Sequence, residues 1–122
     1  MSTQTLTGEN FEPTVTSNDI VLVDFWASWC GPCRMFAPVY EAAAEEHQDI
    51  VFGKVDTEAE QVLAGAAQIT SIPTLVAFRD GILVFSQPGA LPASALEQVI
   101  DGLRSLDMDD VRARLAKQSA TA

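Results

Sequence analysis

The chain of 122 residues has the length of one domain, and its 48% hydrophobic and 20% charged residues are typical of a globular protein rather than a disordered or membrane-embedded one. The formal charge is −10. Residues 1–103 contribute −11, because they contain 14 acidic side chains and only three basic ones, Arg34, Lys54 and Arg79. Such a field repels phosphate groups, so nucleic acids and anionic membranes are poor candidates as partners.

The N-terminal sequence carries no mark of secretion. The segment MSTQTLTGEN at residues 1–10 lacks a cationic start and an apolar core, and no stretch approaches the roughly 18 apolar residues that span a bilayer. We therefore expect a cytoplasmic protein. In that reducing compartment a permanent structural disulfide is not expected, and a close cysteine pair indicates catalysis or metal binding.

The first strong secondary-structure signal is the segment IVLVDFW at residues 20–26. A near-continuous run of β-branched and aromatic residues is typical of a strand buried on both faces, so this strand should be central in a sheet. The Ala- and Glu-rich residues 32–47 predict a helix, with Pro32 in its first turn and a kink at Pro38. Its expected inward face consists of Met35, Val39, Ala42 and Ala43.

A second strand and a second helix follow. The segment IVFGKVD at residues 50–56 predicts another buried strand, and TEAE at residues 57–60 has the pattern of a capping box that starts a short helix. Strand, helix, strand in this order implies a parallel pair joined by a right-handed crossover.

The last third of the domain predicts a hairpin and a helix. Residues 74–79 and 82–87 flank Asp80-Gly81, which is a strong signal for an antiparallel hairpin. Residues 92–103 predict an amphipathic helix, whose inward face should consist of Leu96, Val99, Ile100 and Leu103. Together the elements predict an α/β fold, with a mixed sheet and helices on both of its faces.

Cys30 and Cys33, the only cysteines, lie at the predicted helix start in the segment WASWCGPCRM. Side chains three positions apart near a helix start are about 5–6 Å apart, close enough for a reversible disulfide. The unpaired N–H groups and the positive end of the helix dipole favour a thiolate at Cys30, which makes it the better nucleophile. Cys33 should be less exposed and should act when a mixed disulfide on Cys30 has to be resolved.

Zinc is the alternative for this pair, because a CxxC motif is half of many four-ligand sites. No third cysteine exists, and His47 lies some 14 residues away toward the other end of the helix. We expect no metal site within one chain and a solvent-exposed His47.

Asp24 stands in the middle of the predicted central strand. A carboxylate is costly to bury as an anion, so its pKa should be raised and it should accept protons near neutral pH. Because its strand leads into the cysteine loop, a proton relay is one interpretation. The other is an aspartate that only caps a loop end.

The segment VDFWASWCGPCRMFAP resembles the active-site segment of the thioredoxin family. Three other parts are similar to that family: Lys54-Val55-Asp56, SIPT at residues 71–74, and Gly89-Ala90. The resemblance covers about residues 3–105 in unbroken order. It implies the thioredoxin fold, a central mixed β-sheet of four to five strands flanked by helices, with the domain at residues 1–106.

The resemblance also implies roles for individual residues. Asp24, with Lys54 nearby, would deprotonate Cys33, and the bond before Pro73 would be cis. Trp29, Gly31 and Pro32 would form the active-site loop. A shallow apolar docking surface for substrates would consist of Trp29, Ile72, Pro73, Gly89 and Ala90. Trp26 has a more structural interpretation, packing under the loop.

Two features depart from the family pattern. Arg34 stands where many members have lysine, and Pro88 stands where an apolar, often β-branched residue is common, so the groove's substrate preference is open. The chain also continues past the usual end of the family. Residues 107–122 begin with aspartates and end with basic residues, which suits a helix dipole, so an extra helix with loose packing is expected.

The resemblance implies a protein dithiol–disulfide oxidoreductase that reduces disulfides in other proteins and binds no cofactor. Reducing equivalents would come from NADPH through a flavin-containing thioredoxin reductase. Expected substrates are peroxiredoxins, ribonucleotide reductase and sulfoxide reductases, and a monomer is expected. The alternatives are a thioredoxin-like oxidant or isomerase, and a non-catalytic binding module.

Overall fold

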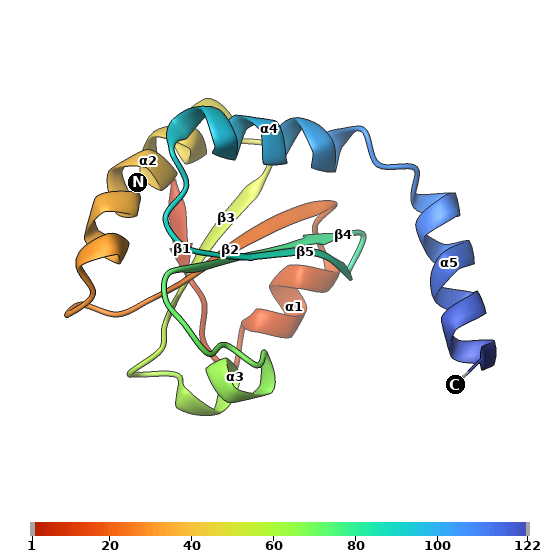
Figure 1. Ribbon diagram of the computed structural model, residues 1–122, viewed down its shortest axis with the longest axis horizontal. Coiled ribbons are helices and arrows are strands. Elements are labelled where there is room, and N and C mark those ends of the chain that lie inside the picture. The colour runs from red at the N-terminus through yellow and green to blue at the C-terminus, as the bar shows by residue number, and fades with distance from the viewer. Residues whose placement is uncertain (1, 122) are drawn as a thin grey trace.

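A five-stranded sheet forms the centre of the computed structural model, which describes residues 2–121 and, within that range, the side chains as far as residue 118 (Figure 1). The elements in chain order are β1 (Thr3–Thr5), α1 (Phe11–Thr16), β2 (Ile20–Trp26), α2 (Gly31–Glu46), β3 (Val51–Asp56), α3 (Gln61–Ala66), β4 (Thr74–Arg79), β5 (Ile82–Pro88), α4 (Ala93–Arg104) and α5 (Met108–Thr121).

The sheet is mixed, with the strand order β1-β3-β2-β4-β5. The strands β1, β3 and β2 are parallel, whereas β4 is antiparallel to β2 and β5 is antiparallel to β4. The prediction that residues 20–26 form the central strand is confirmed, since β2 lies between β3 and β4 and is buried along all but its last residue. The predicted fold class, a mixed sheet of four to five strands flanked by helices, is confirmed, and the sheet has five strands.

Helices cover both faces of the sheet, as predicted. Helices α2 and α4 lie together over one face and α1 and α3 over the other (Figure 1). The larger core lies under α2 and α4, where Phe36, Tyr40, Phe52, Leu96 and Ile100 are almost fully buried.

The predicted inward face of α2 is right for Ala43 and, in part, for Val39, but it is wrong for Met35 and Ala42, because the buried face is turned by about a quarter of a turn. Met35 is 74% exposed, and the buried residues of the helix are Cys33, Phe36, Tyr40, Ala43 and Ala44. Both sets have helical spacing, but the one that contains Phe36 and Tyr40 buries two aromatic rings, which stabilises the core more than burying a methionine and alanines.

The predicted capping box at residues 57–60 was also wrong. Helix α3 starts only at Gln61, and no side chain caps it. Instead, Thr57 donates from both its N–H and its hydroxyl group to the carbonyl oxygen of Trp26, at 2.9 and 3.0 Å. These two hydrogen bonds connect the loop after β3 to the end of β2, just before the segment that carries the cysteines.

The predicted hairpin is confirmed. Asp80 and Gly81 both have positive φ angles, 54° and 79°, which is what a tight two-residue turn between antiparallel strands requires.

The start of α5 is attached to this turn. The carboxylate of Asp80 forms an ion pair with Arg112 of α5, at a distance of 2.9 Å. Together with the buried Met108, this contact attaches the start of α5 to the hairpin end of the sheet. The rest of α5 extends along the outside of the domain, away from the start of α2 (Figure 1). Among the described residues, no helix has the length and apolar character needed to cross a bilayer.

Gly53 in β3 is a position where the fold needs a glycine. A Cβ atom there would lie 2.4 Å from Cδ1 and 2.8 Å from Cγ of Leu6, a side chain that is 1% exposed and has no room to move. We expect Gly53→Ala to lower the free energy of unfolding by about 1–3 kcal/mol in urea titrations of the oxidised protein.

Gly102 in α4 is the matched control, because a Cβ atom there meets nothing within 4 Å. Gly102→Ala should raise the free energy of unfolding by up to about 1 kcal/mol, since alanine is the better helix former. Equal effects of the two substitutions would contradict the packing described for Leu6.

Candidate redox site

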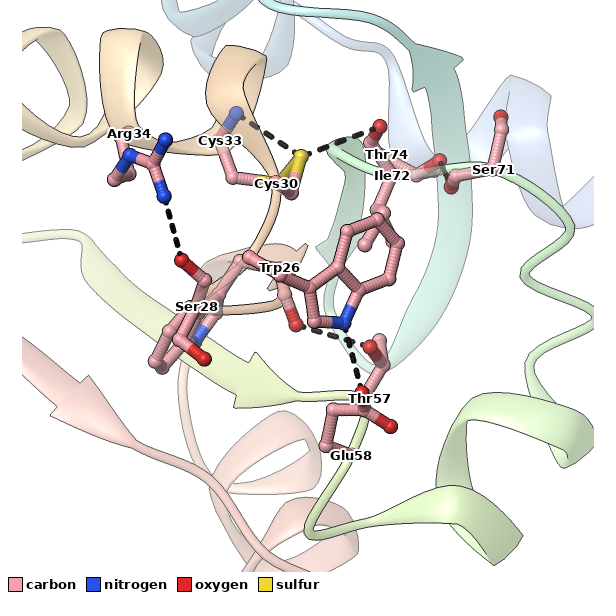
Figure 2. Close-up of a disulfide and its surroundings, with 11 residues drawn as sticks. Trp26, Ser28, Cys30, Cys33, Arg34, Thr57, Glu58, Ser71, Ile72 and Thr74 are labelled. Atoms are coloured by element: carbon pink, nitrogen blue, oxygen red, sulfur yellow. Dashed lines mark hydrogen bonds between the residues drawn. A yellow bond between two sulfur atoms is a disulfide. The ribbon is translucent and has the colours of Figure 1, made fainter.

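The cysteine pair sits at the junction of β2 and α2, as the sequence predicted. Cys30 is the N-cap residue of α2, and its Sγ accepts the backbone N–H of Cys33 at 3.2 Å (Figure 2). The two residues are joined by a disulfide, with their Cα atoms 5.2 Å apart. A sulfur that is held by a backbone N–H group at a helix start is stabilised as a thiolate once the bond is reduced.

The expected difference in exposure between the two cysteines is not seen. Cys30 is 4% exposed and Cys33 is 3% exposed, and both pack with Ala27 under partly buried Trp26 and Ile72. What distinguishes Cys30 is its surroundings. Its Sγ lies 3.7 Å from the carbonyl oxygen of the partly buried Ile72, which follows the exposed Thr70 and Ser71. Trp29, next to it in the chain, is 65% exposed.

The segments predicted to form a docking surface lie together. The peptide bond between Ile72 and Pro73 is cis, as predicted, and the carbonyl oxygen of Pro73 accepts the N–H of Gly89 at 2.8 Å. Gly89 has a φ angle of 98°, which glycine adopts without strain, and Gly89 and Ala90 are exposed. Pro73 itself is buried, so the accessible residues on this side are the partly exposed Ile72 and the exposed Gly89 and Ala90.

Glu58 is a residue at the site that sequence reasoning missed. The indole Nε1 of Trp29 donates to Oε1 of Glu58 at 2.7 Å, which holds the exposed ring in one orientation (Figure 2). The clue in the sequence was the acidic segment directly after β3, which brings side chains to the same edge of the sheet as the end of β2.

Asp24 is buried in the sheet as predicted, with 1% exposure, opposite Lys54 of β3 and Leu75 of β4. Neither of its carboxylate oxygens has a hydrogen-bond partner among the described residues. Burial raises the pKa of Asp24 to about 7, although the positive charge of Lys54 partly lowers it. The alternative that Asp24 caps a loop end is therefore excluded.

A small cavity joins Asp24 to the cysteine pair. Its volume is about 100 Å³, and Asp24, Trp26, Cys33 and Lys54 are among the residues that line it. The Nζ of Lys54 lies 5.1 Å from the centroid of the Trp26 ring, a cation–π distance that positions the lysine beside the acid. A cavity of this size has room for water between Cys33 and Asp24.

His47 was expected to be exposed, and this was wrong. Its side chain is 18% exposed, and Nε2 lies 2.9 Å from Oε1 of Glu97. Arg104 lies 3.1 Å from Nδ1 and forms an ion pair with Asp49. The group joins the end of α2 to α4, at the opposite end of α2 from the cysteines.

His47 also belongs to a group of side chains that is close enough together to hold a metal ion. Potential ligand atoms of Glu46, His47 and Glu97 lie within 4.8 Å of one another. The contact with Arg104 argues against a metal there. A guanidinium group can only donate, so Nδ1 accepts and the ring proton lies on Nε2, where a metal would have to bind.

Fold and site together define a thiol–disulfide oxidoreductase: a cysteine pair at a helix N-terminus, beside a buried acid, on a mixed sheet covered by helices. Comparison with known proteins agrees. The thioredoxin family model matches residues 2–102. A Streptomyces coelicolor protein assigned as thioredoxin 2 is 60% identical over 121 residues, which cover 99% of this chain and 90% of that protein.

Solved structures are similar as well. A mutant thioredoxin from Halobacterium salinarum superposes with a TM-score of 0.81 and 36% identity, over 87% of this chain and 94% of that one. A chain from work on the thiol-resolving mechanism of a yeast mitochondrial 1-Cys peroxiredoxin superposes with a TM-score of 0.76 and 32% identity, over 86% and 96%. The chain belongs to the thioredoxin family and is a disulfide reductase with a redox-active cysteine pair, a class that typically needs no bound cofactor.

Proposed function

We propose that Cys30 is the attacking and Cys33 the resolving cysteine in the reduction of protein disulfides. The thiolate of Cys30 attacks one sulfur of the substrate disulfide, that bond breaks, and one substrate thiolate leaves while a mixed disulfide forms. Cys33 then attacks Cys30, which releases the second substrate thiolate and forms the Cys30–Cys33 bond. Two electrons pass to the substrate. The observation that carries this assignment is the N–H of Cys33 pointing at the Cys30 sulfur at the start of α2.

Asp24 is the proton acceptor for Cys33 in this proposal. A group with a pKa near 7 accepts and returns protons readily at neutral pH. The shared cavity supplies the route, and Lys54 and Trp26 form its wall. Asp24 acts on the second step only, because it is Cys33, not Cys30, that lines the cavity with it.

Substrates dock as extended segments beside Cys30. The carbonyl group of Ile72 lies next to the Cys30 sulfur and offers backbone pairing to an added strand, while Trp29, Pro73, Gly89 and Ala90 complete the surface. Gly31 and Pro32 shape the loop that carries the pair. This surface has to stay open for each new substrate, so the protein acts as a monomer.

Reduction of the pair comes from NADPH through a flavin-containing thioredoxin reductase, which acts as a partner and leaves no cofactor bound here. The substrates are disulfides of peroxiredoxins, ribonucleotide reductase and sulfoxide reductases. The similarity to the chain from the yeast peroxiredoxin work supports the first class. A reductant works where the thiol pool is reduced, which places this protein in the cytoplasm.

Residues 1–106 suffice for this activity, since residues 107–121 lie away from the start of α2, which carries the cysteines (Figure 1). We expect the full chain and a variant ending at residue 106 to support the same rate of NADPH oxidation by a thioredoxin reductase with insulin as substrate. Loss of the buried Met108 should cost about 2 kcal/mol of unfolding free energy.

A folded 1–106 variant that fails in this assay would contradict the assignment of the domain. No NADPH oxidation with the full chain, in the presence of a reductase active toward other family members, would contradict the proposed electron source.

A further inference from the structure

We propose that the hollow beside Trp29 is a subsite for a cationic side chain, arginine before lysine, on the disulfide-bearing segment of a substrate. This proposal rests on the proposed function and adds to it a charge preference. The hollow has a volume of about 210 Å³ and is lined by Trp29, Thr57, Ala64, Ile69, Thr70, Ser71 and Ile72. Ile72 places it next to the attacking cysteine, because the Ile72 carbonyl oxygen is 3.7 Å from Sγ of Cys30.

The walls of the hollow suit a guanidinium group. One wall is the indole of Trp29, 65% exposed, whose face attracts a cation. The lining also includes the exposed Thr70 and Ser71, residue types whose hydroxyl groups can accept hydrogen bonds. A planar guanidinium stacks on an aromatic ring and donates at its edges at the same time, which an ammonium does not do.

Glu58 is not among the residues that line the hollow, but it places a negative charge beside it. Its Oε1 accepts the indole N–H of Trp29 at 2.7 Å, so the carboxylate is fixed at the edge of the ring. None of the ion pairs among the described residues involves Glu58. A cation over the ring would therefore lie near a carboxylate that has no ion-pair partner among the described side chains.

The cations of the domain are engaged elsewhere. Arg34 donates to the carbonyl oxygen of Ser28 at 2.9 Å, on another side of the cysteine pair from Glu58 (Figure 2). Lys54 lies over Trp26, and Arg79 bonds the carbonyl oxygen of Leu103 at the end of α4. With a charge of −11 over residues 1–103, the field around the site also favours cationic segments over anionic ones.

The test uses short peptides whose single cysteine forms a mixed disulfide with thionitrobenzoate. Reduced Cys30 attacks the peptide sulfur, the bond to thionitrobenzoate breaks, and the coloured thiolate leaves. The peptides carry either arginine or its neutral isostere citrulline, immediately before the cysteine in one set and immediately after it in another. For the wild-type protein at low salt we expect arginine to be about two- to five-fold faster than citrulline in at least one set. The preference should shrink as salt is added.

The variant Glu58→Gln should bring the arginine-to-citrulline ratio close to one. The control Glu45→Gln removes the same charge from an exposed position near the other end of α2 and should leave the ratio unchanged. A wild-type ratio of one would overturn the subsite. So would a Glu58→Gln variant that slows both peptides equally, because Glu58 would then only orient Trp29. Failure to release thionitrobenzoate from any peptide would instead count against the proposed function.

Discussion

The variant Cys30→Ser is expected to lose disulfide reduction completely, leaving only the uncatalysed rate. Cys30 lies at the start of α2, where the N–H of Cys33 and the helix dipole stabilise a thiolate, and no other described group offers a nucleophilic sulfur at the exposed edge. The rate of insulin reduction by dithiothreitol, with and without protein, measures this loss.

Cys33→Ser is the matched variant, with the same atom replaced three residues further on. It should also lack turnover but should accumulate a one-to-one mixed disulfide with the substrate, which intact-protein mass spectrometry detects. A trapped complex with Cys30→Ser, and none with Cys33→Ser, would reverse the two roles.

The substitution Asp24→Asn is expected to stabilise the oxidised protein in alkaline solution and not in acid. The pKa of Asp24 is raised from 3.8 to about 7 by burial, so the folded state binds this proton more tightly than the unfolded state does. The stability that the protonated acid contributes is fully present below pH 4 and is lost as the pH rises through 7. Above that pH the wild-type protein carries a buried carboxylate without a hydrogen-bond partner.

The size of this effect follows from the shift of about three pKa units, which corresponds to about 4 kcal/mol at pH 9. Urea titrations of the wild-type protein and of Asp24→Asn at pH 4 and pH 9 measure it, with Asp56→Asn on the neighbouring strand as a control. A difference that is the same at both pH values would show that folding does not shift the pKa of Asp24.

The same variant should slow the second step of the reaction near neutral pH, because Cys33 loses its proton acceptor. Rapid-quench measurement of how fast the mixed disulfide disappears separates this step from the attack by Cys30. An unchanged rate would remove Asp24 from the mechanism.

The central strand, the hairpin and the redox pair could be predicted from the sequence because each depends on local chemistry. A strand buried on both faces needs an apolar run, a two-residue turn needs residues that tolerate positive φ, and two cysteines at a helix start are neighbours in any fold. Asp24 could be singled out for the same reason, since its burial followed from its place in the strand.

Other features depend on what lies across the sheet, which one sequence does not show. The face of α2 was misjudged because two sets of apolar residues have helical spacing, and only the sheet beneath decides between Met35 and Phe36. Strand β1 and helix α1 are short and have little periodicity of their own. β1 forms because β3 offers a parallel edge. Glu58 and His47 acquire their roles from residues 29 and 50 positions away in the chain.

An equilibrium redox titration of the Cys30–Cys33 pair, in glutathione and dithiothreitol buffers, tests the central claim most directly. The fluorescence of Trp26, which packs against the pair, and of Trp29, next to Cys30 in the chain, reports the state of the bond. We expect one reversible two-electron transition at a potential well below the poise of glutathione, as a protein-disulfide reductant requires. A transition near or above that poise would make this protein an oxidant or isomerase, and the absence of a reversible transition would contradict redox function altogether.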